Sequence, residues 1–228
     1  MMMSRFRNAC AAAVLLGAMI AARPIAPVQT STASDSSVVA KAGGALERAA
    51  RARANKKVID RYDPTFRKYT KRFFGPAFDW KYFKAQGFAE SGLKADATSW
   101  VGARGVMQLM PSTYREIASH RPEFGTIDQP EWNIAAGIMH DRYLWTLYQK
   151  DVPDDERHRF MFASYNAGEG TINRAITMAR SKNAGPVWAP AWSSVAVIAP
   201  TMQRWRYSET LGYVRRIDSV YAKLSGQP

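Results

Sequence analysis

The sequence predicts a mainly α-helical domain that follows a basic N-terminal leader. From Asp60 onward, apolar residues recur at helical spacing and are separated by turn residues and helix-starting signals. All seven Trp and 25 of the 27 aromatic residues lie after residue 62, so the material for a core lies there. With 46% hydrophobic residues, 228 residues suffice for one core, which excludes a wholly disordered chain.

The leader carries more than half of the net charge of +13. Residues 1–62 hold ten Lys or Arg and three Asp or Glu, a net of +7, whereas residues 63–228 carry only +6. Arg5 and Arg7 precede an uncharged apolar run over residues 9–22, a pattern that predicts a signal peptide at residues 1–22. An uncleaved anchor is the alternative, although the run is shorter than the roughly 20 residues that span a bilayer.

A flexible basic linker is predicted over residues 23–59. Its first part is rich in Ser, Thr and Pro, and residues 41–57 carry six basic residues and one acid among alanines. This second part is either a solvated, partly helical linker, which we favour, or a basic helix that makes peripheral contact with an anionic membrane surface. The single cysteine, Cys10, lies in the signal, so the mature chain has no cysteine, which suits an oxidising compartment.

The folded domain is predicted over residues 60–228, and its helices follow from local signals. Asp79 is a good N-cap for a helix that ends near Ser91, and Pro111 suits the first turn of a helix to about Ser119. Further helices are expected over residues 134–148, 155–167 and 171–180, and after residue 208. Residues 94–110, which contain Gly102 and Gly105, are expected to form a loop or a short hairpin, and residues 183–206 to be irregular.

Glu90 is the first candidate for chemistry. Helical spacing places it on the face of Phe83, Gln86 and Gly87, at i−7, i−4 and i−3. A carboxyl group on an aromatic, apolar face loses solvation, which favours its protonated form and makes it a general acid near neutral pH. An ordinary glutamate near a helix end is the alternative.

Five short strings follow one another at domain-sized spacing: Phe88–Gly92, Ser99–Pro111, Pro130–Ile134, Ala163–Gly168 and Glu209–Tyr213. This succession resembles the soluble-type lytic transglycosylases, whose catalytic domain has a goose-type lysozyme fold. Residues 63–81 further resemble the catalytic domain of the membrane-bound transglycosylase F type. That type also carries a solute-binding-like domain, which we expect to be absent because only residues 1–59 precede the match.

The resemblance implies cleavage of peptidoglycan between N-acetylmuramic acid and N-acetylglucosamine, with a 1,6-anhydromuramic end as product. Glu90 protonates the glycosidic oxygen and then acts as base on the C6 hydroxyl of the muramoyl sugar. Ordinary glycosidases need a second carboxylate, whereas here the sugar supplies its own nucleophile. Asp96 is the nearest other acid in the sequence and is interpreted as a turn residue.

The resemblance also implies a substrate groove around Glu90. Its candidate residues are Ser91, Met107, Gln108, Tyr165, Asn166, Ala167, Glu209 and Tyr213. Core packing is the alternative for Met107 and Tyr165, and a structural i,i+4 pair is the alternative for Glu209 and Tyr213. Three further aromatic residues are either a stacking platform for sugars or local core: Trp188, Trp192 and Trp205.

Other functions remain open on the sequence alone. A hydrolytic lysozyme and a catalytically silent wall-binding or assembly protein share the fold, whereas a nucleic-acid binder is disfavoured because the basic excess lies in the leader. We expect an exported protein of the periplasm or cell envelope, with glycan strands and cell-envelope or secretion-apparatus proteins as partners. Histidines at 120, 140 and 158 match no metal motif, so no metal or organic cofactor is expected.

Overall fold

A computed structural model of the chain describes residues 47–53, 56–57, 59–182 and 189–226. The predicted signal peptide and most of the predicted linker lie outside the described residues. Residues 47–53 of the linker form an exposed helix, in which Arg51 and Glu47 make an ion pair at 3.2 Å. This segment belongs to a separate unit, and the unit with the candidate residues comprises, in its described part, the chain from Asp63 onward.

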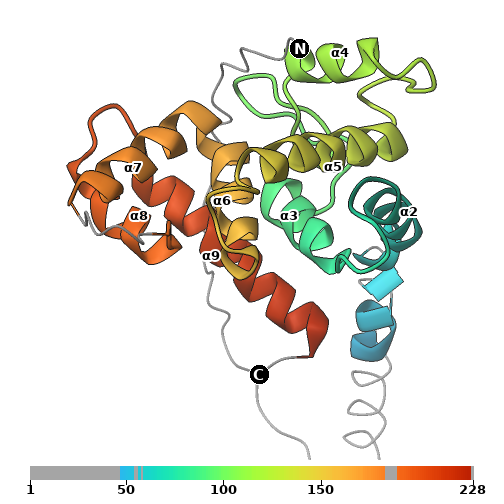
Figure 1. The fold of residues 1–228 in the computed structure, drawn as a ribbon. Helices are drawn as coiled ribbons and strands as arrows, with labels where there is room; N and C mark the ends of the chain where they lie inside the picture. Colours follow the sequence, from blue (N-terminus) through green and yellow to red (C-terminus); the bar gives the residue numbers. More distant parts are fainter. Residues whose placement is uncertain (1–46, 54–55, 58, 183–188, 227–228) are drawn as a thin grey trace, which may run out of the picture. The chain divides into compact units, whose positions relative to one another are not determined.

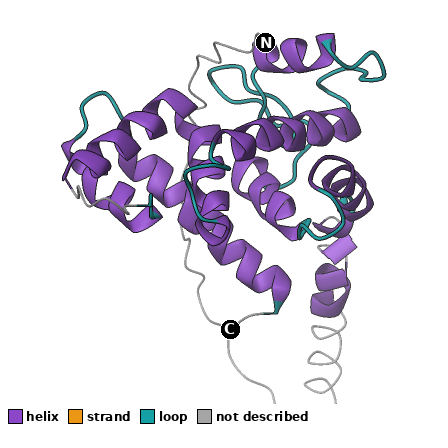
Figure 2. Cartoon of the chain, in the orientation of Figure 1, coloured by secondary structure: helices purple, strands orange, loops and turns teal. Residues whose placement is uncertain are grey.

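From Asp63 onward the described residues form helices joined by loops, and there is no strand among them (Figure 2). The mainly α-helical fold class predicted from the sequence is confirmed. None of the helices in the described part of the chain is long and apolar enough to cross a membrane. The helices are α2 (Asp63–Phe74), α3 (Lys81–Ser91), α4 (Pro111–Ser119), α5 (Pro130–Leu147), α6 (Asp154–Ala167), α7 (Glu169–Lys182), α8 (Trp192–Ile198), the 3-10 helix η1 (Ala199–Thr201) and α9 (Tyr207–Ser225).

Most helix starts follow from local signals. Pro111 and Pro130 occupy the first turns of α4 and α5, where the missing N–H of proline costs no hydrogen bond. Helix α5 therefore begins ahead of its predicted start at residue 134. Asp79 lies just before α3, and its Oδ1 accepts a hydrogen bond from the Lys81 amide at 3.0 Å.

The prediction that residues 183–206 are irregular is wrong for part of this segment. Residues 183–188 lie outside the described chain, but the structure continues with α8 and η1. Helix α8 has no side-chain cap of its own. Instead Glu156 of α6 accepts a hydrogen bond from the Trp192 backbone N–H at 2.8 Å, a partner too distant in sequence for local signals to reveal.

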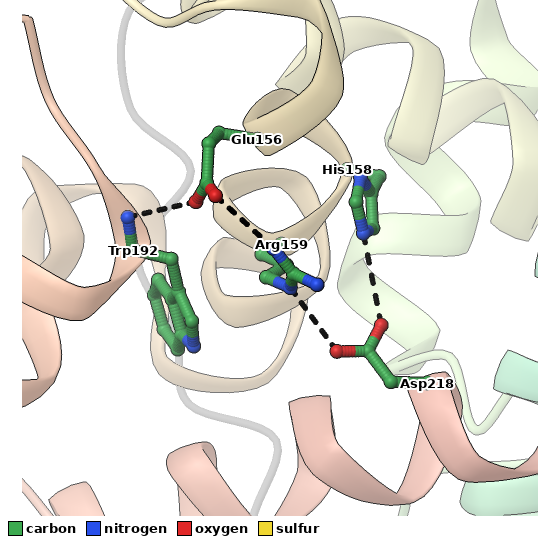
Figure 3. A network of polar contacts seen from close by, with 5 residues as sticks. All are labelled: Glu156, His158, Arg159, Trp192 and Asp218. Carbon is green, nitrogen blue, oxygen red and sulfur yellow. Dashed lines mark hydrogen bonds and ion pairs between the residues drawn. The ribbon is translucent and has the colours of Figure 1, made fainter.

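Glu156 belongs to a polar network that joins α6, α8 and α9 (Figure 3). Arg159 lies between Glu156 at 3.2 Å and Asp218 of α9 at 3.1 Å, and His158 Nε2 lies 3.6 Å from Asp218. Burial alone raises the pKa of Asp218, but hydrogen bonds from His158 and Arg159 outweigh it and hold that pKa below its usual value. The network thereby fixes α8 and α9 around α6.

Helix α3 is held by aromatic contacts on two sides. It packs mainly against α9, while α5 packs against α2 and α6 (Figure 1). Tyr82 of α3 stacks on Tyr221 of α9 with ring centroids 3.8 Å apart. Phe78 stacks on Phe83 at 5.3 Å and meets the edge of Trp145 of α5, also at 5.3 Å. Each such pair contributes about 1 kcal/mol beyond area burial, so α3 is a firmly placed support for Glu90.

Candidate active site around Glu90

Glu90 lies in the last turn of α3. Phe83 and Gln86, on the same helix face, are fully buried, as the helical spacing predicts. Gly92 ends the helix in the left-handed region at φ 64°, and its N–H bonds to the Phe88 carbonyl at 3.0 Å. The carboxyl group is therefore at the end of a rigid helix and faces the interior.

The Glu90 carboxyl meets α9. Tyr213, buried on that helix, donates a hydrogen bond from its hydroxyl to Glu90 Oε1 at 2.5 Å. Burial raises the pKa of Glu90 to about 8, and the Tyr213 hydrogen bond and the charge of Arg216 act against this rise. Arg216 also reaches the Ala89 carbonyl at 3.4 Å. At neutral pH Glu90 therefore carries a proton that it can give away.

The segment between α3 and α4 is a loop that is closed on itself. Single antiparallel bridges join Arg104 to Thr98 and to Leu109, with Gly102 and Gly105 at φ 88° and 76°. These isolated bridges do not make a strand. Of the two predicted alternatives, a loop or a short hairpin, the segment forms a loop. Glycine suits both positions because other residues rarely adopt a positive φ.

Gln108 stabilises this loop from within. Its backbone has φ 45°, and its amide nitrogen donates hydrogen bonds to the carbonyls of Ala97 and Gly105, both at 3.0 Å. Ser91 joins the loop to α3, since its hydroxyl bonds to the Val106 carbonyl at 2.8 Å. Both candidate binding residues thus have structural contacts in the loop next to Glu90.

The Tyr165 hydroxyl donates to the Met107 carbonyl at 2.8 Å, which ties α6 to the same loop. The family resemblance implies that the Tyr165 hydroxyl lies near Glu90; the hydrogen bond to Glu90 itself comes from Tyr213. The Met107 side chain is fully buried, as in the packing alternative, so we expect any contribution of Met107 to binding to come from its backbone.

The remaining candidates lie where α6 ends and α9 begins. Asn166 is buried and accepts a hydrogen bond from the Thr210 hydroxyl at 2.9 Å, while Ala167 is the partly exposed last residue of α6. The Trp205 indole donates to the same Thr210 hydroxyl at 3.0 Å. Trp205 is buried, so of the two alternatives for this tryptophan the structure gives local core.

Glu209 and Tyr213 occupy successive turns of α9. Glu209 is partly exposed and pairs with Arg206 at 3.4 Å, whereas Tyr213 reaches inward to Glu90. Trp192 packs edge-on against Phe160 at 5.6 Å, and Trp188 lies outside the described residues.

Comparison with known proteins agrees with this geometry. The sequence model of the family described as Transglycosylase SLT domain matches residues 75–186. This segment is therefore similar to the transglycosylase SLT domain. The match contains Glu90 and the loop that follows it and ends before α8 and α9, so Tyr213 lies beyond it.

Relatives of the SLT domain extend further along the chain. The "Membrane-bound lytic murein transglycosylase F" of Yersinia enterocolitica is 34% identical over 162 residues, which are 69% of this chain and 31% of that protein. The protein of the same name from Shewanella pealeana is 27% identical over 165 residues, 72% of this chain and 32% of that protein. The chain thus spans about a third of the length of these curated relatives.

A solved structure shows the same fold. The 70 kDa soluble lytic transglycosylase from Escherichia coli matches with a TM-score of 0.55 and 25% identity, over 73% of this chain and 25% of that one. The lysozyme-like helical fold predicted from the sequence is therefore confirmed.

Asn133 holds the loop between α3 and α4. In the sequence it belongs to the string Pro130–Ile134, and no separate role was predicted for it. Its amide donates to the carbonyls of Arg104 at 2.9 Å and Ile127 at 3.0 Å, and its oxygen accepts from the Met107 N–H at 2.8 Å. It is fully buried, and a Cβ on Gly105 would lie 2.5 Å from its amide nitrogen. Gly105 thus makes room for the side chain that fixes the loop.

Asp141 of α5 is a carboxyl group near Glu90 that the sequence did not single out. It is fully buried and accepts a hydrogen bond from Gln86 Nε2 at 3.3 Å, whereas Asp96 is exposed. Burial raises the pKa of Asp141 well above its usual value, the Gln86 hydrogen bond acts against this rise, and ionisation of Glu90 raises the pKa further. Within the described ranges, no three His, Cys, Asp or Glu side chains come together as a metal site.

Proposed function

We propose that this chain is a peptidoglycan lytic transglycosylase, which cleaves the β-1,4 bond between N-acetylmuramic acid and N-acetylglucosamine. The observation that carries the proposal is the Glu90 carboxyl, which is half-buried, hydrogen-bonded by Tyr213 and has a pKa of about 8. Such a group is a general acid at neutral pH. The Yersinia and Shewanella relatives are named lytic murein transglycosylases, which supports peptidoglycan as the substrate.

In the proposed reaction one carboxyl group serves twice. Glu90 gives its proton to the glycosidic oxygen as the bond to C1 breaks, and becomes a carboxylate. Tyr213 donates to that carboxylate and Arg216 carries a positive charge nearby, so the ionised form is stabilised for the second step. The carboxylate then takes the proton of the C6 hydroxyl, whose oxygen closes on C1. Glu90 regains its proton and no water is consumed.

The groove that we propose for the glycan is formed by the candidate residues around Glu90. Ser91 and Tyr165 hold the loop of Gln108 against α3 and α6, so these residues shape the groove largely through the loop backbone. Glu209 is the partly exposed acid one turn before Tyr213 and is proposed to bind sugar hydroxyls. The catalytic domain is proposed to extend over residues 60–228.

The chain is proposed to act in the cell envelope, as an exported or membrane-tethered protein. The relatives are named membrane-bound, which supports the envelope. The net charge of +6 after residue 62 suits a glycan that bears acidic groups, an attraction that salt weakens. Partner proteins of the envelope or of a secretion apparatus remain part of this proposal.

The test is digestion of purified peptidoglycan by the wild type and by Glu90→Gln, followed by mass analysis of the fragments. Anhydro ends, lighter than reducing ends by one water molecule, support the proposal when Glu90→Gln forms none and the matched control Glu116→Gln, exposed on α4, forms as many as wild type. Reducing ends identify a hydrolytic lysozyme. Cleavage that survives in Glu90→Gln rejects the single-acid mechanism.

A further inference from the structure

A buried polar pair lies one turn before Glu90. Gln86 of α3 precedes Glu90 by four residues, so the two side chains share a helix face. Asp141 approaches from the middle of α5, and Gln86 Nε2 donates to its Oδ1 at 3.3 Å. Both side chains are fully buried. The pair therefore connects the catalytic helix to α5 out of contact with solvent.

The pair formed by Gln86 and Asp141 lacks one hydrogen-bond donor. Two of its atoms, Asp141 Oδ2 and Gln86 Oε1, are buried and have no hydrogen-bond partner. Both are acceptors as long as Asp141 is ionised, and buried acceptors without donors are costly. A proton on Oδ2 supplies the donor, because Oδ2–H can then bond to Oε1 while Nε2–H bonds to Oδ1. A carboxylic acid and an amide joined in this way have every polar atom of the pair satisfied.

The charges around Asp141 agree with a neutral acid. Two titratable groups on neighbouring helices interact electrostatically with Asp141: Glu90 of α3 and Tyr213 of α9. Each of these two groups is either neutral or negative. On α5 itself, burial lowers the pKa of His140 to about 4, so His140 is uncharged at neutral pH, and it packs against Tyr165 of α6 at 5.3 Å.

The other two helices that pack on α5 also place no free cation at this position. Four basic groups of α2 and α4 have contacts away from Asp141: Lys68 pairs with Glu131 at the start of α5, Arg72 pairs with Glu123, Arg67 lies over the Trp80 ring at 4.5 Å, and Arg115 bonds to a carbonyl of its own helix. No cation among these contacts would hold Asp141 as a carboxylate.

We propose that Asp141 is a positioning residue for the reaction at Glu90: as a neutral acid it closes a two-bond pair with Gln86 and fixes the last turns of α3 without placing a charge beside Glu90. The inference rests on the proposed function and adds a second carboxyl group to it. Glu90 has to lose its proton in the first step. A permanent carboxylate nearby would oppose that ionisation, whereas a neutral acid does not.

Two variants of the same size separate this role from ordinary packing. Asp141→Asn replaces the acid O–H by an amide N–H and keeps both hydrogen bonds, so kcat, KM and the pH profile are expected to stay within about twofold of wild type. Asp141→Leu removes both bonds and leaves the Gln86 amide unpaired, so kcat is expected to fall about tenfold with little change in KM. Gln86→Met combined with Asp141→Leu is expected to recover part of that loss, because no amide is then left unpaired.

The proposal is overturned when Asp141→Asn loses as much kcat as Asp141→Leu. It is equally overturned when Asp141→Asn moves the alkaline limb of the pH profile to lower pH, since loss of a negative charge would lower the pKa of Glu90. Thermal unfolding of each variant shows that the folded state is present at the assay temperature.

A measurement without substrate tests the proton itself. In a Glu90→Gln background, infrared spectra at pH 7 are expected to show the carbonyl band of a protonated buried carboxyl group, and Asp141→Asn to remove it. Absence of the band refutes this inference even when cleavage is observed. A band that Asp141→Asn removes supports the acid–amide pair even when no variant cleaves peptidoglycan, and then the proposed function alone has failed.

Discussion

Replacing the Glu90 carboxyl by an amide is expected to stabilise the domain, by an amount that grows with pH. Below pH 4.5 the carboxyl is protonated in both the folded and the unfolded chain. Between pH 4.5 and about 8 the unfolded chain releases this proton, while the folded chain retains it because of burial. The wild type therefore loses stability as the pH rises through this window, and Glu90→Gln, which has no proton to lose, does not.

The size of the effect follows from the shift in pKa. Each pKa unit corresponds to about 1.4 kcal/mol, so the difference between variant and wild type is near zero at pH 4, about 3 kcal/mol at pH 7 and about 5 kcal/mol at most above pH 8. The amide oxygen of glutamine can still accept the Tyr213 hydrogen bond, so little of the packing is lost.

Urea unfolding followed by tryptophan fluorescence at pH 5, 7 and 8.5 measures this difference in the free energy of unfolding. Contributions of titrating groups that do not interact with Glu90 cancel between the two proteins, and Glu116→Gln serves as the exposed control. Curves for wild type and Glu90→Gln that run parallel from pH 5 to 8.5 would refute a raised pKa of Glu90, and with it the acid role.

Three further substitutions test single contacts. Tyr213→Phe removes a hydrogen-bond donor that lowers the pKa of Glu90. We therefore expect kcat to fall about tenfold and the alkaline limb of the pH–rate profile to move to higher pH. An alkaline limb that stays in place contradicts this contact. Asn133→Leu removes three hydrogen bonds and leaves the Met107 N–H and the Ile127 carbonyl without these partners, while the Arg104 carbonyl keeps its bond from the Leu109 N–H. The free energy of unfolding in urea is expected to fall by about 3 kcal/mol, whereas a loss below about 1 kcal/mol argues against the network. Thr210→Val unpairs the Trp205 indole and is expected to cost about 2 kcal/mol in thermal unfolding with kcat retained; a large loss of kcat would place this contact in the reaction.

The fold could be predicted wherever residues within one turn of a helix end signal that the helix starts or stops there. The start of α4 at Pro111 depends on residues within one turn, and the structure places it where the sequence does. Asp79 also lies within one turn of α3 and accepts the Lys81 N–H, but the N-cap is Trp80 rather than the predicted Asp79. Helix α8 has no such signal. Its first N–H is satisfied by Glu156, 36 residues earlier, and its burial depends on α6 and α7, so its short sequence reads as irregular.

The candidate site also contains residues that local sequence predicts and residues that it does not. Glu90 could be predicted because Phe83 at i−7 and Gly87 at i−3 mark the face of its own helix as one that packs inward. Asp141 could not, because a single aspartate in α5 gives no hint that Gln86, 55 residues earlier, faces it. A polar residue on the otherwise buried face of Gly137, Ile138 and Leu144 is the signal that would have pointed to it.

The loop after α3 has a thermodynamic consequence for recognition. Its backbone is held by hydrogen bonds within the protein, which come from its own turns, from Gln108 and from Asn133. Little chain entropy is then left to lose on association, so glycan affinity depends on the contacts themselves. Amide hydrogen exchange in this loop should accordingly be slow in the free protein and change little when a glycan fragment binds, as in a receptor formed before its ligand arrives.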